Sequence, residues 1–127
     1  MEERDNATGS DIHERAMAYG VRAIRLFRRL QKDKDQASWV VGRQFLRSAL
    51  SVGANLAEAD AAESKADFIH KCSVAQKEAR ESWYWLRVMT RADILSPSQL
   101  DGLTDEARQI AAIVTAIARN AKRRSES

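Results

Sequence analysis

Cysteine, proline, glycine and aromatic residues are all scarce in this sequence. It has one Cys, one Pro and five Gly in 127 residues, and only 6% of its residues are aromatic. A β-rich domain would need more turn residues and more β-branched and aromatic residues, so the composition argues against a sheet fold. The lone cysteine, Cys72, cannot form a disulfide within the chain and is typical of a reducing compartment. We therefore expect a cytoplasmic protein.

Long hydrophobic runs are absent as well. The longest nearly apolar stretch, Ile110 to Ala118, is interrupted by Thr115 and is about half as long as a bilayer-spanning helix. The first ten residues, MEERDNATGS, are polar and acidic, unlike a secretory or mitochondrial leader. These features predict a soluble protein with no membrane partner.

What the sequence does contain is helical periodicity in four segments, rich in alanine and arginine. The expected helices span about 10–30 and 36–61, then one segment after Ser64 and one from Pro97. Their apolar stripes are Ala16, Gly20, Ala23, Phe27 and Leu30, widened by Met17 and Ile24; Val41, Phe45, Ala49, Val52 and Leu56; Phe68, Cys72, Ala75, Ala79, Ser82, Leu86 and Met89; and Leu100, Leu103, Ala107, Ile110, Val114, Ile117 and Ala121.

Helix start signals agree with these segments. Ser64 is followed by Asp67 three residues later, and Ser96 precedes Pro97 with Gln99 placed to complete a capping box. Seven-residue repeats with short connections favour near-antiparallel packing. We predict an all-α, antiparallel up-down four-helix bundle over residues 10–121, with a disordered segment 1–9 and a frayed basic tail 122–127.

The segment from residue 44 to 95 resembles a family of four-helix bundle proteins encoded in intervening sequences of bacterial 23S ribosomal RNA genes. It reads QFLRSALSVGANLAEADAAESKADF and then AQKEARESWYWL. The matching positions are Gln44, Arg47, Ala49, Ser51, Asn55, Ala57, Glu58, Ser64, Phe68, Ala75, Glu81 and Leu86. Gly53 replaces a usual proline and Ala59 a usual glycine, and without that glycine the second helix is expected to continue towards Ser64.

This resemblance implies a cone- or barrel-shaped homopentamer without a cofactor. The family is also similar to the accessory variability determinant proteins of diversity-generating retroelements, which bind nucleic acid and a reverse transcriptase through basic surfaces. The resemblance therefore implies a ring-like homo-oligomer that acts as a binding or scaffold module, not as an enzyme.

A polar stripe on the second helix and an aromatic trio on the third are candidates for contacts between helices or subunits. The stripe comprises Ser48, Ser51, Asn55 and Glu58, and hydrogen bonding with Arg47 or Glu81 is one expectation for it. Trp83, Tyr84 and Trp85 point in different directions on a helix, so at least one ring should lie outside the core. The set comprising Arg47, Ser51, Asn55, Glu58, Glu81 and Trp85 has two interpretations, a subunit interface or a structural polar network, and a solvated face remains the alternative for the stripe.

Positive charge is concentrated between residues 15 and 47, where nine basic and two acidic side chains give +7. The candidate nucleic-acid-binding residues are Arg15, Arg22, Arg25, Arg29, Lys32 and Arg43. Like charges one turn apart repel, so an RNA or DNA backbone could offset this row. An acidic segment of a neighbouring subunit, residues 58–67, could do the same. Aromatic rings on which bases could stack are scarce on the first helix, where only Tyr19 is available, so binding should be electrostatic and weakly sequence-selective.

Catalytic signatures are missing from the sequence. Asp67 and His70 have the Glu-x-x-His type of spacing used in di-metal bundles but fall in the first turn of the third helix. Cys72 occupies a core position, and no glycine-rich phosphate loop or Gly-x-Ser-x-Gly elbow is present. We therefore expect no catalytic, metal or cofactor-binding residues.

Overall fold

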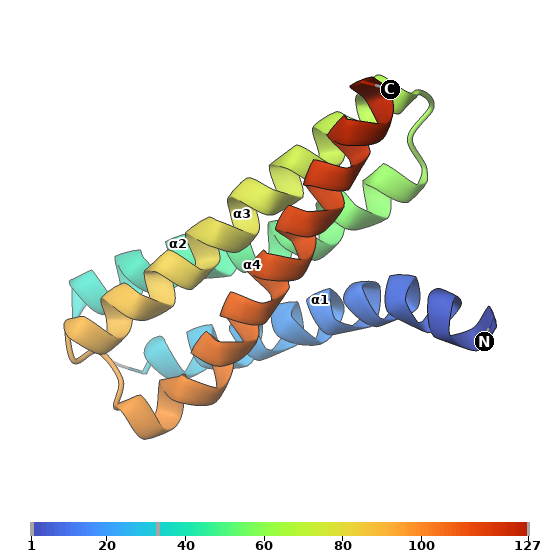
Figure 1. Ribbon diagram of the computed structural model, residues 1–127. Helices are drawn as coiled ribbons and strands as arrows, with labels where there is room; N and C mark the ends of the chain where they lie inside the picture. Colours follow the sequence, from blue (N-terminus) through green and yellow to red (C-terminus); the bar gives the residue numbers. More distant parts are fainter. Residues whose placement is uncertain (1, 33, 127) are drawn as a thin grey trace.

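Four α-helices account for most of the chain, and successive helices run in opposite directions (Figure 1). The computed structural model describes residues 2–32 and 34–126, with side chains described from residue 11 onward. The helices are α1 (Glu2–Leu30), α2 (Gln36–Asp60), α3 (Lys65–Arg91) and α4 (Pro97–Glu126). No strand is present in this part of the chain. The predicted all-α arrangement of four helices is therefore confirmed.

The four helices do not pack equally closely. α2 and α3 form the most extensive pair, α4 packs on α3, and α1 packs on α2. Contact between α1 and α4 is much smaller. In Figure 1 these two helices lie together at the carboxyl end of α1 and the start of α4, and they diverge towards the opposite end. The bundle is thus most open along the edge between α1 and α4.

Each of the three later helices begins with a polar side chain that binds a free backbone N–H group. Asp35 accepts a hydrogen bond at 3.2 Å from the backbone two residues on, and Ser64 accepts one at 3.0 Å from the N–H of Asp67. At the start of α4, the Gln99 side chain accepts a bond of 3.0 Å from the N–H of Ser96. The predicted starts of these helices are therefore confirmed.

The carboxyl ends of α2 and α3 are built differently. α2 ends at Asp60 with Ala61 as its cap at φ −99°, so Ala59, where the family pattern has glycine, is helical, and the helix does not continue to Ser64 as expected. After α3, Asp93 adopts a left-handed conformation with φ 57°. Its N–H bonds to the carbonyl of Thr90 at 3.2 Å, and the N–H of Ile94 bonds to that of Met89 at 3.0 Å. This is a Schellman motif with aspartate in the position that glycine usually takes.

Both outer helices are longer than the sequence pattern predicts. α1 begins at Glu2 rather than near Ser10, and α4 runs to Glu126 through most of the segment expected to fray. Basic residues in the last turn of α4 favour this extension, because they face the negative end of the helix dipole. The predicted disordered segment 1–9 falls on residues whose side chains lie outside the described part, and it stays a prediction.

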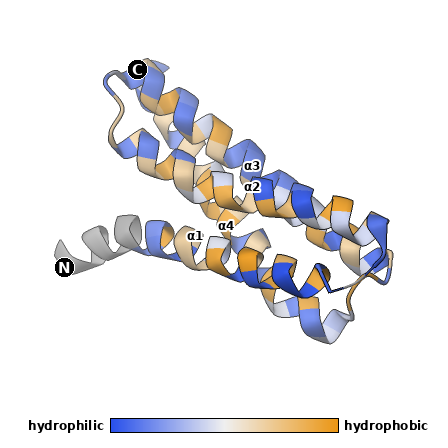
Figure 2. Cartoon of the chain, turned by 180° about the vertical axis from the view of Figure 1, so that it is seen from behind, coloured by the Kyte–Doolittle hydropathy of each residue, from blue (hydrophilic) through white to orange (hydrophobic). Residues whose placement is uncertain are grey.

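Hydrophobic residues alternate with hydrophilic ones along the coloured part of every helix (Figure 2). The predicted stripes of α2, α3 and α4 are largely buried; those with at most 5% exposure are Phe45, Ala49, Val52, Leu56, Cys72, Ala75, Ala79, Ser82, Leu86, Met89, Leu100, Leu103, Ala107, Ile110 and Val114. The seven-residue repeat therefore identified the core of three helices correctly.

The core face of α1 was predicted in part, since Ala16, Gly20, Ala23 and Leu30 of the predicted stripe are buried. Ile12, Tyr19 and Leu26 are buried, whereas Met17 is 67% exposed. A residue advances by about 100° around a helix, so Met17 lies well round from the neighbouring core residue Ala16, towards α2. The expectation that Met17 widens the core stripe was wrong, and its side chain belongs to an outer face instead.

Candidate functional site

Three arginines of α1 form an exposed basic strip beside the start of α4, here called the arginine edge: Arg22, Arg25 and Arg29. Together with Gln99 and Leu103 of α4 they line a shallow hollow of about 250 Å³. In the described part of the chain, none of the three has a carboxylate within ion-pair distance. Since like charges one turn apart repel, the edge is an electrostatically unfavourable strip that an anion would stabilise.

Arg15 lies in the same row but is engaged within the molecule. Its Nε donates to Glu106 Oε2 at 3.0 Å and its Nη2 to Glu106 Oε1 at 2.7 Å, a bidentate pair between α1 and α4. Nη2 also donates to Gln109 at 2.9 Å, and Asp11 lies 3.9 Å from Nη1. The hydrogen bond with Glu106 raises the pKa of Arg15. The structure thus separates Arg15 from the predicted basic surface.

The other two predicted basic residues are placed differently again. Lys32 lies two residues beyond the last residue of α1, Leu30, and is exposed. Arg43 belongs to α2 and stacks its guanidinium on Trp39, 4.8 Å from the ring centroid. Tyr19, the expected stacking ring of α1, is only 1% exposed and meets Phe45 edge to face. The arginine edge therefore contains charge without an accessible aromatic ring.

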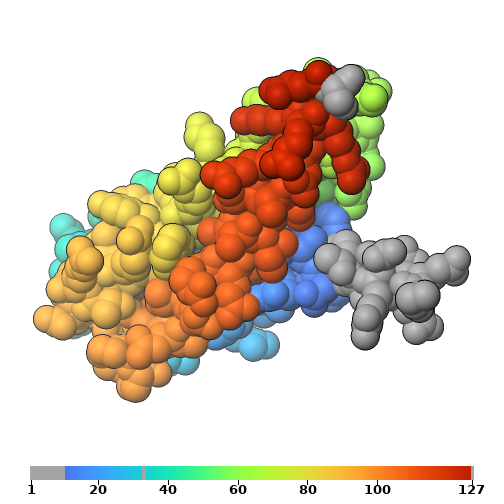
Figure 3. All heavy atoms as spheres, viewed as in Figure 1, coloured from blue at the N-terminus to red at the C-terminus, as the bar shows by residue number. Residues whose placement is uncertain are grey.

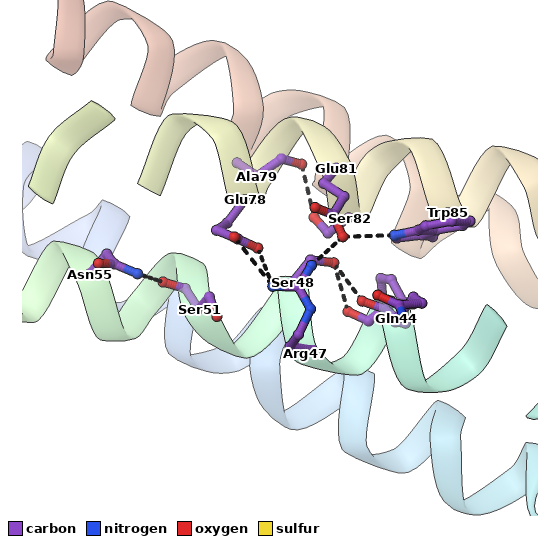
Figure 4. A network of polar contacts seen from close by, with 11 residues as sticks. Gln44, Arg47, Ser48, Ser51, Asn55, Glu78, Ala79, Glu81, Ser82 and Trp85 are labelled. Carbon is purple, nitrogen blue, oxygen red and sulfur yellow. Dashed lines mark hydrogen bonds and ion pairs between the residues drawn. The ribbon is translucent and has the colours of Figure 1, made fainter. Parts of the chain in front are cut away.

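A polar network joins α2 to α3 and includes three of the predicted interface residues (Figure 4). Arg47 Nη1 lies 3.0 Å from Glu78 Oε2, and its Nη2 donates to Glu81. The indole Nε1 of Trp85 donates to the same Glu81 oxygen at 3.0 Å. We call these four residues the α2–α3 polar network. They bind one another within a single chain, as in the structural interpretation of this set.

The carboxyl of Glu81 is tuned by two opposing effects. Partial burial raises its pKa, but hydrogen bonds from Trp85 and Arg47 outweigh this and bring the pKa below its ordinary value. The same hydrogen bond to Glu81 raises the pKa of Arg47. Both groups therefore stay charged at neutral pH, and the carboxylate is suited to an ion pair rather than to general acid catalysis.

The rest of the polar stripe does not join this network. Asn55 donates to the carbonyl of Ser51 at 2.8 Å within its own helix, and Glu58 pairs with Lys71 of α3 at 2.9 Å. The expectation that Arg47 or Glu81 partners Glu58 was wrong. Eleven residues separate Glu58 from Arg47, about 16 Å along a helix, which is beyond the reach of their side chains.

An apolar groove runs between α1 and α2 on the outside of the bundle, with a volume of about 460 Å³. Met17, Val21 and Ile24 line it from α1, and Leu50 and Ala54 line it from α2. Met17 is 67% and Leu50 42% exposed. The sequence analysis missed this groove, although apolar residues outside the core repeat, such as Val21 and Leu50, were the signal for it.

The sequence analysis also missed a second basic surface, on the outside of α3. Lys77, Arg80, Tyr84, Arg87 and Arg91 follow one another at steps of three and four residues and are all exposed. Tyr84 is 51% exposed, which confirms that one ring of the aromatic trio lies outside the core. The steps of three and four residues between these basic side chains are visible in the sequence and were the signal for this surface.

Groups with catalytic potential are few in the described residues. No three His, Cys, Asp or Glu side chains there are grouped so as to hold a metal ion. Cys72 is buried, and desolvation raises the pKa of its thiol. His13 pairs with Asp60 at 2.9 Å. None of the described helices is long and apolar enough to cross a membrane.

Comparison with known proteins places these features in a family context. The model of the 23S rRNA-intervening sequence protein family matches residues 9–116. A solved structure with 31% sequence identity superposes with a TM-score of 0.79 and covers 88% of this chain and 98% of its own. It is a protein of unknown function from the S23 ribosomal protein family of Bacteroides thetaiotaomicron VPI-5482. No curated protein matches the chain.

Proposed function

Because the chain belongs to the family of 23S rRNA-intervening sequence proteins, we propose that it is a non-enzymatic, homo-oligomeric module that binds RNA or DNA at its arginine edge. The observation that carries this proposal is the contrast among the basic residues. Carboxylates neutralise Arg15 and Arg47, whereas Arg22, Arg25 and Arg29 face solvent without a partner in the described part of the chain. Three guanidinium groups along one helix edge suit a row of phosphates.

Binding at this edge is driven by phosphate contacts. Each neutralised phosphate releases condensed counterions, so affinity depends steeply on salt. The hollow beside the edge offers Gln99 and Leu103 but no exposed ring on which a base could stack. Contacts of this kind position a nucleic acid without reading its sequence. The module therefore holds nucleic acid with little sequence preference.

Self-assembly is the second part of the proposal. The apolar groove exposes Met17 and Leu50 beside small residues such as Gly20 and Ala54, which allow a helix to approach closely. We assign the groove to a second copy of the chain, in a ring for which the family resemblance favours five subunits. Repetition of the arginine edge around such a ring would raise the avidity for a long polyanion.

The nucleic-acid proposal is tested by binding of the purified protein to structured RNA and to duplex DNA between roughly 50 and 200 mM salt. Reversal of two charges in Arg25→Glu/Arg29→Glu should abolish binding to both. The matched control is Arg119→Glu/Arg123→Glu, which changes the net charge equally on exposed positions of α4. Equal losses of affinity in both variants would show that only the net charge of the protein matters. If wild-type protein binds neither RNA nor DNA at low salt, the proposal is refuted.

A protein scaffold without nucleic-acid binding is the alternative function, and the apolar groove favours it. Leu50→Lys places a charge in the groove at an already exposed position, so it should dissociate the assembly without unfolding the subunit. Light scattering measures the mass of the wild-type protein and of the Leu50→Lys variant, and circular dichroism checks that their helix content is the same. An assembly whose mass changes neither with salt nor in the arginine edge variants would favour the scaffold.

A further inference from the structure

The outer face of α3 combines positive charge with aromatic rings, which the arginine edge does not. We call the set Lys77, Arg80, Trp83, Tyr84 and Arg87 the α3 outer face, because these residues line one shallow hollow of about 420 Å³ together with Glu81. Tyr84 is 51% exposed and Trp83 is half-buried. The α3 segment, yellow in Figure 3, is in part not covered by another helix in that view.

The carboxylates nearest to this face are directed elsewhere. Glu78 and Glu81 lie on α3, but both bind Arg47 of α2, and Glu81 also accepts the indole N–H of Trp85 (Figure 4). Glu81 borders the hollow, but the α2–α3 polar network engages both carboxylates, so neither forms an ion pair with a basic residue of the outer face. The three basic residues of the outer face have no ion-pair partner in the described part of the chain.

Arg87 organises the aromatic part of the face. Its guanidinium carbon lies 4.4 Å from the centroid of the Trp83 ring and 5.9 Å from that of Tyr84. A guanidinium held on one ring keeps its other side available, and RNA-binding proteins stack unpaired bases on such planes and on aromatic rings. The hollow thus combines a guanidinium with aromatic rings on which a base could stack, and Lys77 and Arg80 lie one to two turns from Tyr84 for phosphates.

We propose that the α3 outer face binds unpaired bases of single-stranded RNA or DNA, with a base stacked at Tyr84 and Arg87 and the adjoining phosphates held by Lys77 and Arg80. This inference rests on the proposed function and adds a second, structurally distinct contact to it. Bases within a duplex are stacked on one another and do not reach an aromatic side chain, so this face selects single strands. The arginine edge, by contrast, contacts phosphates of either form.

The experiment compares a fluorescently labelled single-stranded uridine oligonucleotide with an RNA duplex of similar length, using anisotropy with the full-length protein. Tyr84→Ala should weaken single-strand binding by about tenfold, since loss of one stacked base costs on the order of 1–3 kcal/mol. Duplex binding should stay unchanged. Tyr84→Phe keeps the ring and should restore single-strand affinity. Arg80→Gln should instead reduce the salt slope of single-strand binding by about one phosphate contact.

The outcomes separate this inference from the proposed function. If Tyr84→Ala leaves single-strand affinity intact while Arg25→Glu/Arg29→Glu abolishes binding, the stacking face is refuted and the arginine edge stands. If Tyr84→Ala lowers the mass of the assembly and weakens both ligands equally, the face is a subunit contact and the inference fails. If wild-type protein binds neither ligand, both proposals fail together.

Discussion

Tyr19 of α1 donates a hydrogen bond of 2.9 Å to Ser82 of α3, and both side chains are at most 1% exposed. Ser82 in turn donates to the carbonyl of Ala79 at 2.8 Å, so its hydroxyl proton is committed to its own helix. Burial raises the pKa of Tyr19, so the phenol stays protonated and remains the donor. This contact ties the two helices together inside the core, where Ser82 is one of three buried serines in the described residues.

Ser82→Ala should destabilise the protein more than Tyr19→Phe. Without Ser82 the buried Tyr19 hydroxyl loses its acceptor, a cost of about 1–3 kcal/mol, whereas Tyr19→Phe removes one neutral bond of about 0.5–1.5 kcal/mol. Urea denaturation of the single variants and of the double variant measures both values and their coupling. Equal and additive losses would show that packing, not the hydrogen bond, determines the effect.

The core of α2, α3 and α4 could be predicted from the sequence because their apolar residues follow one continuous stripe. In α1 the predicted stripe was also largely buried, but a second apolar face obscured the borders of the core. Met17 and Val21 are as apolar as Tyr19 and Leu26, and periodicity alone does not say which of two neighbouring faces meets the other helices. Only the packing of α1 on α2 decides that Tyr19 is buried and Met17 exposed.

The candidate site was less predictable for a similar reason. A row of like charges is visible in the sequence, but the partners that neutralise Arg15 and Arg47 come from distant segments, Glu106 on α4 and Glu81 on α3. Such pairs depend on which helices are neighbours and on their register. The sequence therefore identified the basic row, and the three-dimensional structure determines which of its members remain available to a ligand.

Arg15 and Arg22 should behave differently when each is changed to alanine. Arg15→Ala removes the bidentate pair with Glu106 at the most open edge of the bundle, and its side chain is only 24% exposed, so we expect a loss of about 1–2 kcal/mol. Arg22 has no ion-pair partner in the described residues, and Arg22→Ala should be within about 0.5 kcal/mol of wild type. Thermal or urea unfolding compares the two, and a similar loss in both would contradict a specific role for the Glu106 pair.

Stability should fall as the pH is lowered through the titration range of Glu81. Because the folded-state pKa is below the ordinary value of 4.5, the carboxylate stabilises the protein above that value and loses this contribution as the pH falls through the folded pKa. Glu81→Gln should therefore destabilise the protein at about pH 7, and its difference from wild type should be smaller at about pH 3. Urea unfolding at both pH values, followed by tryptophan fluorescence, provides the comparison. A difference that is the same at both would assign the effect to packing.

Asp93→Gly should stabilise the protein. Asp93 is held at φ 57° in the Schellman motif that ends α3, a conformation that strains side chains with a Cβ atom and that glycine adopts freely. Relief of that strain should outweigh the greater freedom of glycine in the unfolded chain, for a net gain of about 0.5–1 kcal/mol. Asp93→Ala is the matched control, because it removes the carboxylate but keeps the Cβ atom. Urea unfolding should rank glycine above aspartate and aspartate above alanine; alanine equal to glycine would mean that the carboxylate, not the backbone conformation, limits the stability of this turn.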